Sequence, residues 1–249
     1  MSAPNEFNNL TNQQNKKELV ISYLLLRRLI GILGISLPFI LILGAGLFSN
    51  ARWLQPSISH YYFSVMHISF VGVLCLLCGF LVCYRGQVKQ ENNLSTLAGF
   101  LALGVATFPT DCKGFLGSQY FFVPAWKNWY EWVHYGSAAC LFICFVIFCF
   151  KIFHESDDER TPDLFDDKKK RRNSFYSSCG YIIAISIGCI GAIAVYKLVT
   201  GSSPEFTKYT TFIFETTSLL AFGSSWLLKG TYGLPPMKSP AQKVMNYFR

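Results

Sequence analysis

Residues 108–139 read FPTDCKGFLGSQYFFVPAWKNWYEWVHYGSAA, and this stretch joins two apolar segments that are too long for a soluble protein. It contains an acid, Asp111, an imidazole, His134, and many aromatic residues, none of which a short connector needs. Ionisable groups at the edge of apolar segments usually face a bundle interior or a wet cavity. The stretch therefore predicts the mouth of a polar pocket at one face of a membrane-embedded helical bundle.

The composition of the whole chain agrees with a membrane location. Its 249 residues are 51% hydrophobic and only 14% charged, which is too little polar surface to coat a soluble globule. A helix needs about 20 apolar residues to cross the hydrocarbon core of a bilayer. Six such runs predict an all-α polytopic membrane protein, a six-helix transmembrane bundle with spans at about 29–47, 63–84, 94–110, 131–153, 176–199 and 210–228.

The charged residues predict the orientation of this bundle. Polar tails at residues 1–26 and 231–249 flank a transmembrane domain at residues 27–230, and the N-terminus lacks the pattern of a cleaved signal peptide. With six spans, 17 of the 22 Lys and Arg residues fall on the side of the N-terminus. Because the cytoplasmic side normally carries this excess, both termini are predicted to be cytoplasmic, in a plasma (inner) membrane.

The formal charge of +8 does not indicate a nucleic-acid partner, because most basic residues flank the apolar runs on alternate connectors. Membrane lipids are the expected partners instead. A basic run just before the fifth span is placed to bind anionic lipid head groups. This run consists of Lys168, Lys169, Lys170, Arg171 and Arg172.

Polar residues from separate spans are predicted to converge near the outer face. The candidate ligand-binding residues are Ser59, His60, Tyr61, Asp111, His134, Lys197 and Glu215. Glu215 is the most informative of these, because it lies less than two turns inside the sixth span. It either pairs with Lys197 and locks two helices together, or faces a ligand.

These residue types suit two kinds of chemistry. His60, Asp111 and His134 are ligand types that zinc or manganese accepts, so a divalent metal is one possible cofactor, although no HxxxH or HExxH motif is present. No other cofactor is expected. Ser59 and His60 are adjacent, and adjacent residues on a helix point apart, so these two residues are not expected to form a catalytic dyad.

Short motifs along the chain resemble those of a known family. In order they are SISHYY at 57–62, YRG at 84–86, FPTDC at 108–112, HYGSA at 134–138 and FGSSWLLKG at 222–230. This order is similar to the core pattern of the DRAM/Sfk family of six-span membrane proteins and its uncharacterised prokaryotic relatives. That family includes a GPI-lipid remodelling protein and regulators of lipid distribution, so the resemblance implies a role with lipids.

Three functions are compatible with these observations. The leading hypothesis is an integral membrane protein with a polar pocket in the outer leaflet that binds a lipid head group. The second is a metal-dependent, membrane-embedded lipid hydrolase or transferase acting in the same pocket. The third is a small-solute or proton-coupled transporter, which Lys197 and Glu215 within predicted spans would suit.

Overall fold

The computed structural model describes residues 3–48, 53–86, 89–111, 129–155, 166–201 and 208–231. The predicted C-terminal tail beyond residue 231 and the side chains of residues 3–22 and of Lys168 lie outside this description. The six main helices are α1 (Ala3–Phe48), α2 (His67–Cys83), α3 (Lys89–Thr107), α4 (Trp129–Ile147), α6 (Asp166–Thr200) and α7 (Thr210–Thr231). A 3-10 helix, η1 (Ser59–Phe63), precedes α2, and a π-helical turn, η2 (Phe148–Ile152), leads from α4 into the short α5 (Phe153–Glu155).

The described elements are all helical, so the predicted all-α class is confirmed for this part of the chain. Three helical segments, Tyr23–Phe48, Trp129–Ile152 and Lys169–Thr200, are long and apolar enough to cross a membrane. A fourth apolar helix, His67–Cys83, is shorter. The chain is therefore a membrane protein by the length and composition of its helices.

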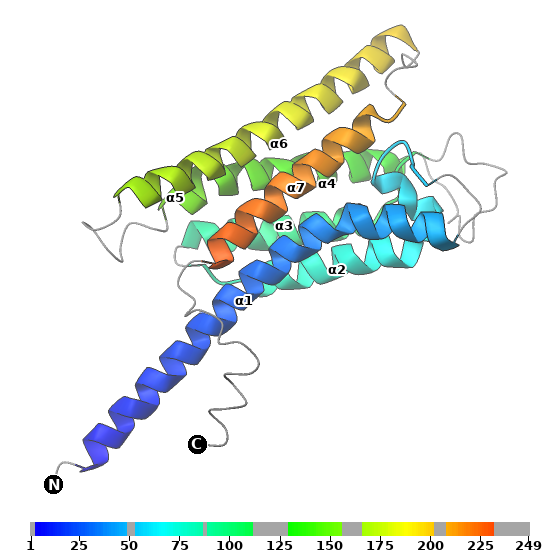
Figure 1. Ribbon diagram of the computed structural model, residues 1–249. Coiled ribbons are helices and arrows are strands. Elements are labelled where there is room, and N and C mark those ends of the chain that lie inside the picture. The colour runs from blue at the N-terminus through cyan, green and yellow to red at the C-terminus, as the bar shows by residue number, and fades with distance from the viewer. Residues whose placement is uncertain are drawn as a thin grey trace.

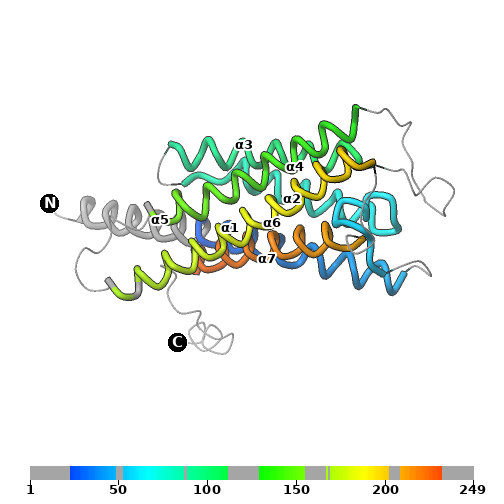
Figure 2. The backbone as a smooth tube through the Cα atoms, turned by 90° about the horizontal axis from the view of Figure 1, so that it is seen from above, coloured from blue at the N-terminus to red at the C-terminus, as the bar shows by residue number. Residues whose placement is uncertain are grey.

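The six main helices pack as a closed ring. Neighbouring pairs in contact are α1–α7, α7–α6, α6–α4, α4–α3, α3–α2 and α2–α1, which returns to the starting helix. Figures 1 and 2 show the helices running side by side along one common direction. The first and last described helices are thus direct neighbours, and every main helix contacts at least two others.

Glycine allows the close approach of α1 and α7. A Cβ atom added to Gly31 would lie 2.7 Å from the carbonyl oxygen of Gly223, and one added to Gly223 would lie 2.6 Å from the carbonyl oxygen of Gly31. Small residues let helix backbones pack this closely in membranes. At the end of this contact, Arg28 Nε donates a hydrogen bond of 3.0 Å to the carbonyl oxygen of Gly230.

One end of the ring, which we call the Arg27 end, holds a buried polar network. Arg27 lies 3.1 Å from the carboxylate of Glu91, and both side chains are almost fully buried. Arg27 Nε donates to the hydroxyl of Tyr84 at 2.8 Å, and Tyr84 in turn donates to Glu91. The ring of Tyr23 stacks on that of Tyr84 and lies beneath the guanidinium. The charges of Arg27 and Glu91 compensate each other within this network, which joins α1 to α2 and α3.

Helix boundaries differ from the predicted spans at one point that matters for the site. The second span was predicted to begin at Phe63, but α2 begins at His67 and is preceded by η1 and an extended residue, Ser64. This segment bends because Ser64 Oγ donates to the Tyr61 carbonyl and accepts a hydrogen bond from the Met66 amide. The irregular backbone brings Ser59 and His60 over the end of the ring.

Candidate functional site

The opposite end of the ring, which we call the η1 end, collects the candidate residues from separate elements. Ser59 and His60 are in η1, Asp111 follows α3, His134 is in the first turns of α4, and Glu215 is in the first turns of α7. Lys197 is near the end of α6. Since α3 and α6 end where η1, α4 and α7 begin, the topology of the ring places all of these residues at one level.

His60 is held by the serine that precedes η1. Ser57 Oγ lies 2.5 Å from His60 Nδ1 and also accepts the backbone N–H of His60 at 3.3 Å. Burial lowers the pKa of His60 to about 4, with Lys197 and His134 acting in the same direction and Asp111 opposing them. His60 is therefore neutral at physiological pH. The sequence predicts that His60 does not pair with its neighbour Ser59, and the structure agrees, because Ser57 is the serine that His60 contacts.

Glu215 reaches from α7 to the backbone just before η1. Its Oε2 atom accepts the amide N–H of Ile58 at 2.5 Å, and the amide of Phe212 donates to the carbonyl oxygen of Pro56 at 3.1 Å. In the part of the chain that the structure describes, the only ion pair within 4 Å is Arg27–Glu91, so the alternative of a Lys197–Glu215 pair is not observed. A backbone amide, not a cation, is the partner that fixes Glu215.

His134 is buried between α3 and η1, and both of its ring nitrogens are engaged. Nδ1 lies 2.7 Å from the carbonyl oxygen of Phe108, and Nε2 lies 2.9 Å from Ser59 Oγ. A carbonyl oxygen can only accept, so Nδ1 carries the proton and Nε2 accepts the hydroxyl proton of Ser59 in the neutral ring. The carbonyl of Phe108 follows the end of α3 at Thr107 and is therefore available to a side chain.

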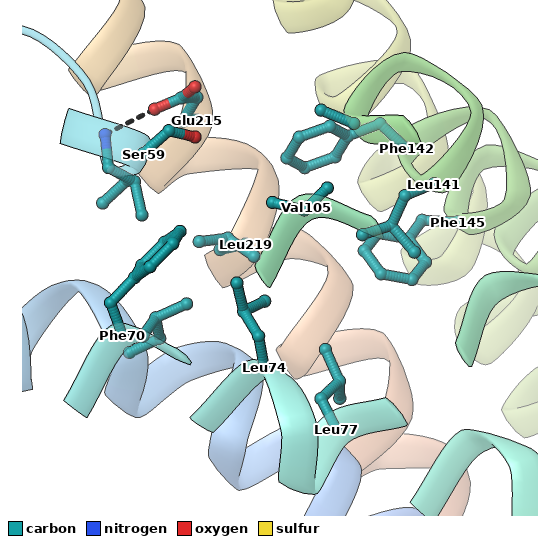
Figure 3. Close-up of a pocket in the computed structure, with 13 residues that line it drawn as sticks. Ser59, Phe70, Leu74, Leu77, Val105, Leu141, Phe142, Phe145, Glu215 and Leu219 are labelled. Carbon is teal, nitrogen blue, oxygen red and sulfur yellow. Dashed lines mark hydrogen bonds between the residues drawn. The ribbon is translucent and has the colours of Figure 1, made fainter. Parts of the chain in front are cut away.

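A cavity of about 40 Å³ lies directly beneath these groups, inside the ring. Figure 3 shows Ser59 and Glu215 at one end of this cavity and apolar side chains around the remainder. The apolar lining comes from α1, α2, α3, α4, α7 and the residue before η1, and it comprises Leu37, Ile58, Phe70, Leu74, Leu77, Val105, Ala138, Leu141, Phe142, Phe145 and Leu219. The space would hold about three water molecules at 10–15 Å³ each. Its amphipathic lining, with polar groups at one end only, suits the boundary between a polar head and an apolar chain.

Five of the seven candidate residues do not line this cavity: His60, Tyr61, Asp111, His134 and Lys197. The hydroxyl of Tyr61 donates to the carbonyl oxygen of Trp53 at 2.6 Å, and its ring packs in the core near Phe212, so its contacts are structural. Burial raises the pKa of Tyr61 to about 12, which keeps this phenol protonated as a donor. Lys197 is exposed, and Asp111 lies near His60 at the edge of the described residues.

The predicted metal ligands do not form a cluster here. Across the described segments, no group of three or more His, Cys, Asp or Glu side chains is arranged to hold a metal ion. In addition, both nitrogens of His134 are occupied by Phe108 and Ser59, which leaves no lone pair of this ring directed at a shared ion with His60. The geometry is that of a hydrogen-bonded site.

Two groups of the site were not found from the sequence, because both belong to the backbone. They are the amide of Ile58, which binds Glu215, and the carbonyl of Phe108, which orients His134. Only the FP pair at 108–109 hinted at the second, because the residue before a proline is disfavoured in a helix and so predicts a helix end.

No family model, no curated protein and no solved structure matches the chain. The resemblance of its motifs to the DRAM/Sfk family therefore stays a prediction.

Proposed function

We propose that all six main helices span the membrane, with the η1 end at the outer face and both termini in the cytoplasm. The distribution of Lys and Arg supports this orientation, as does the position of Trp53, Trp129 and Trp132 at the η1 end. The apolar exposed face of α6, which includes Tyr181, Ile185 and Val195, fits contact with lipid chains. In this orientation the basic run at 168–172 faces anionic lipids of the cytoplasmic leaflet.

We further propose that the η1 end binds the polar head group of a membrane lipid or similar amphiphile. The observation that carries this proposal is the position of Glu215, an acid at the polar end of an otherwise apolar cavity. Taking a carboxylate out of water costs several kcal/mol unless charge or hydrogen bonds compensate it. The backbone of Ile58 and that of Ser59 both donate to this carboxyl group, and a head group with N–H or O–H donors would add further hydrogen bonds.

The cavity supports a specific mode of binding. Its volume of about 40 Å³ accommodates only the first carbons next to a head group, against Phe70 and Leu219. The remaining chain of a lipid would lie along the outside of the ring, in the bilayer. A head group bound in this way donates hydrogen bonds to Glu215. The bond that joins the head group to its apolar chain then lies next to Ser59, the second polar residue of the lining.

The test compares two acid-to-amide variants of the full-length protein, purified in detergent after gentle extraction. We expect Glu215→Gln to reduce co-purifying lipid, measured by native mass spectrometry, by about tenfold or more, as is typical for loss of a hydrogen bond to a charged group. Glu131→Gln is the matched control, since Glu131 lies in the first turn of α4 but does not line the cavity. Equal lipid content in both variants and the wild type would refute the proposal.

A further inference from the structure

The Ser59–His134–Phe108 chain of hydrogen bonds has the geometry of a serine nucleophile with its base. A nucleophilic hydroxyl needs a base within about 2.6–3.2 Å, and that base must be oriented by a third group. Ser59 Oγ lies 2.9 Å from His134 Nε2, and His134 Nδ1 lies 2.7 Å from the carbonyl oxygen of Phe108. The carbonyl fixes the tautomer that leaves Nε2 free to accept the hydroxyl proton.

Of the serine and the histidine, only Ser59 can be reached from the cavity. His134 is 2% exposed and does not line the cavity, whereas Ser59 does, so the hydroxyl lies between the imidazole and the cavity. In Figure 3 the Ser59 side chain lies beside Glu215 at the polar end of the cavity. An apolar wall surrounds the approach to Ser59, which suits a substrate with an apolar chain next to its reacting bond.

Another serine–histidine pair, next to η1, serves as an internal comparison. Ser57 Oγ lies 2.5 Å from His60 Nδ1, but it also accepts the backbone N–H of His60, and neither residue lines the cavity. Its contacts are those of a local turn. The two pairs therefore differ in access and in the third group that orients the base.

We propose that Ser59 is a nucleophile, with His134 as general base, for acyl transfer from an ester-linked lipid. This inference rests on the proposed binding of a lipid head group at the same site. Ser59 Oγ attacks the ester carbonyl carbon while His134 Nε2 takes its proton. The carbon–oxygen bond to the leaving alcohol breaks, and the alcohol leaves with the proton from His134. Water or a second alcohol then attacks the acyl-serine, gives its proton to His134, and Ser59 recovers a proton as the acyl group leaves.

The negative oxygen of the tetrahedral intermediate needs a hydrogen-bond donor. The amide of Ile58, one residue before Ser59, donates to Glu215 at 2.5 Å. A substrate carbonyl oxygen that replaces the Glu215 carboxylate would receive this donor.

A fluorophosphonate probe tests the nucleophile directly. Its phosphorus is attacked by an activated serine oxygen, fluoride leaves, and the serine proton passes to the base. We expect the full-length protein in lipid nanodiscs to be labelled at Ser59, as located by peptide mass spectrometry. Ser59→Ala should abolish labelling, Ser57→Ala should retain it, and His134→Gln should slow it by about 100-fold or more, the usual contribution of a general base.

Thermal unfolding of each variant separates a catalytic effect from a loss of structure. If His134→Gln does not fold, the pH dependence of wild-type labelling replaces it: a rate that rises as one group loses a proton supports a base, and a flat profile contradicts it. An unlabelled wild-type protein, or equal labelling of Ser59→Ala, would overturn the nucleophile. Lipid retention is measured in the same preparations, so a protein that keeps lipid but is not labelled overturns this inference and leaves the binding proposal intact.

Discussion

At the Arg27 end a buried carboxylate lies 3.1 Å from a guanidinium, whereas at the η1 end a carboxylate lies beside an apolar cavity and accepts a backbone amide. Both acids are on helices inside the ring. Glu91 accepts hydrogen bonds from both Arg27 and Tyr84, so a cation compensates its charge. Glu215 has a cavity where Glu91 has an arginine. The difference teaches that a buried acid indicates function only when its surroundings leave space for a partner.

The largest expected change in stability comes from removing one partner of the buried ion pair at the Arg27 end. Glu91→Gln leaves the buried guanidinium of Arg27 without its anion, and loss of one partner of a buried pair typically costs about 3–5 kcal/mol. We expect a loss of this size in the free energy of unfolding in detergent. The double variant Arg27→Met with Glu91→Leu should recover most of it, because two apolar residues leave no unpaired charge. A recovery of less than half would mean that the tyrosine contacts, rather than the ion pair, stabilise this end.

A change of pH should alter the free energy of unfolding through His60 at the η1 end and not through the Arg27 end. The pKa of His60 is about 4 in the folded protein against an ordinary value of 6.5, so below pH 6.5 the unfolded chain takes up a proton that the folded chain does not. The free energy of unfolding should therefore fall as the pH drops from 6.5 to about 4, by up to about 3 kcal/mol at 1.36 kcal/mol per pKa unit. His60→Gln should remove this part of the pH dependence. An unchanged slope in that variant would assign the titration to other groups.

The smallest expected effect is that of Glu215→Gln on stability. The amide oxygen of glutamine can still accept the N–H of Ile58, and no ion pair is lost. We expect the free energy of unfolding to change by less than about 1 kcal/mol, the range of one ordinary hydrogen bond. Measured beside Glu91→Gln under the same conditions, this variant gives the comparison directly. A loss as large as that of Glu91→Gln would mean that Glu215 is a structural residue.

The helices could be predicted from the sequence because apolar runs of membrane length are a strong local signal. The sixth predicted span, 210–228, nearly coincides with α7 at Thr210–Thr231, and the fifth, 176–199, lies within α6. The sequence also predicted that His134, Ser59 and Glu215 lie at the same end of the bundle, because successive spans run in alternating directions. Their partners could not be predicted, because the pairing of Ser59 with His134 depends on the bent backbone of η1 and on how α4 is rotated against it.

Small residues recur in GFLALG at 99–104 and in ISIGCIGAIA at 185–194, a pattern that predicts close helix contacts, and the structure agrees with this prediction only in part. Gly99 in GFLALG is in close contact with Val82, at 2.7 Å from an added Cβ, as expected of a helix contact. Gly188 and Gly191 in α6 face open space within the described structure, so the prediction that they bring helices together is wrong there. The closest backbone contact, between Gly31 and Gly223, joins residues far apart in the sequence, and a single helix pattern carries no information about its partner.

The seam between α1 and α7 has a consequence for biosynthesis. Residues of the first helix, among them Gly31 and Arg28, find their neighbours Gly223 and Gly230 only when the last helix has been made. Until α7 has left the ribosome, the glycine face of α1 has only lipid or a chaperone to contact. The ring thus stays open until α7 has been inserted, and a nascent chain that stops before Thr210 has no means of closing it.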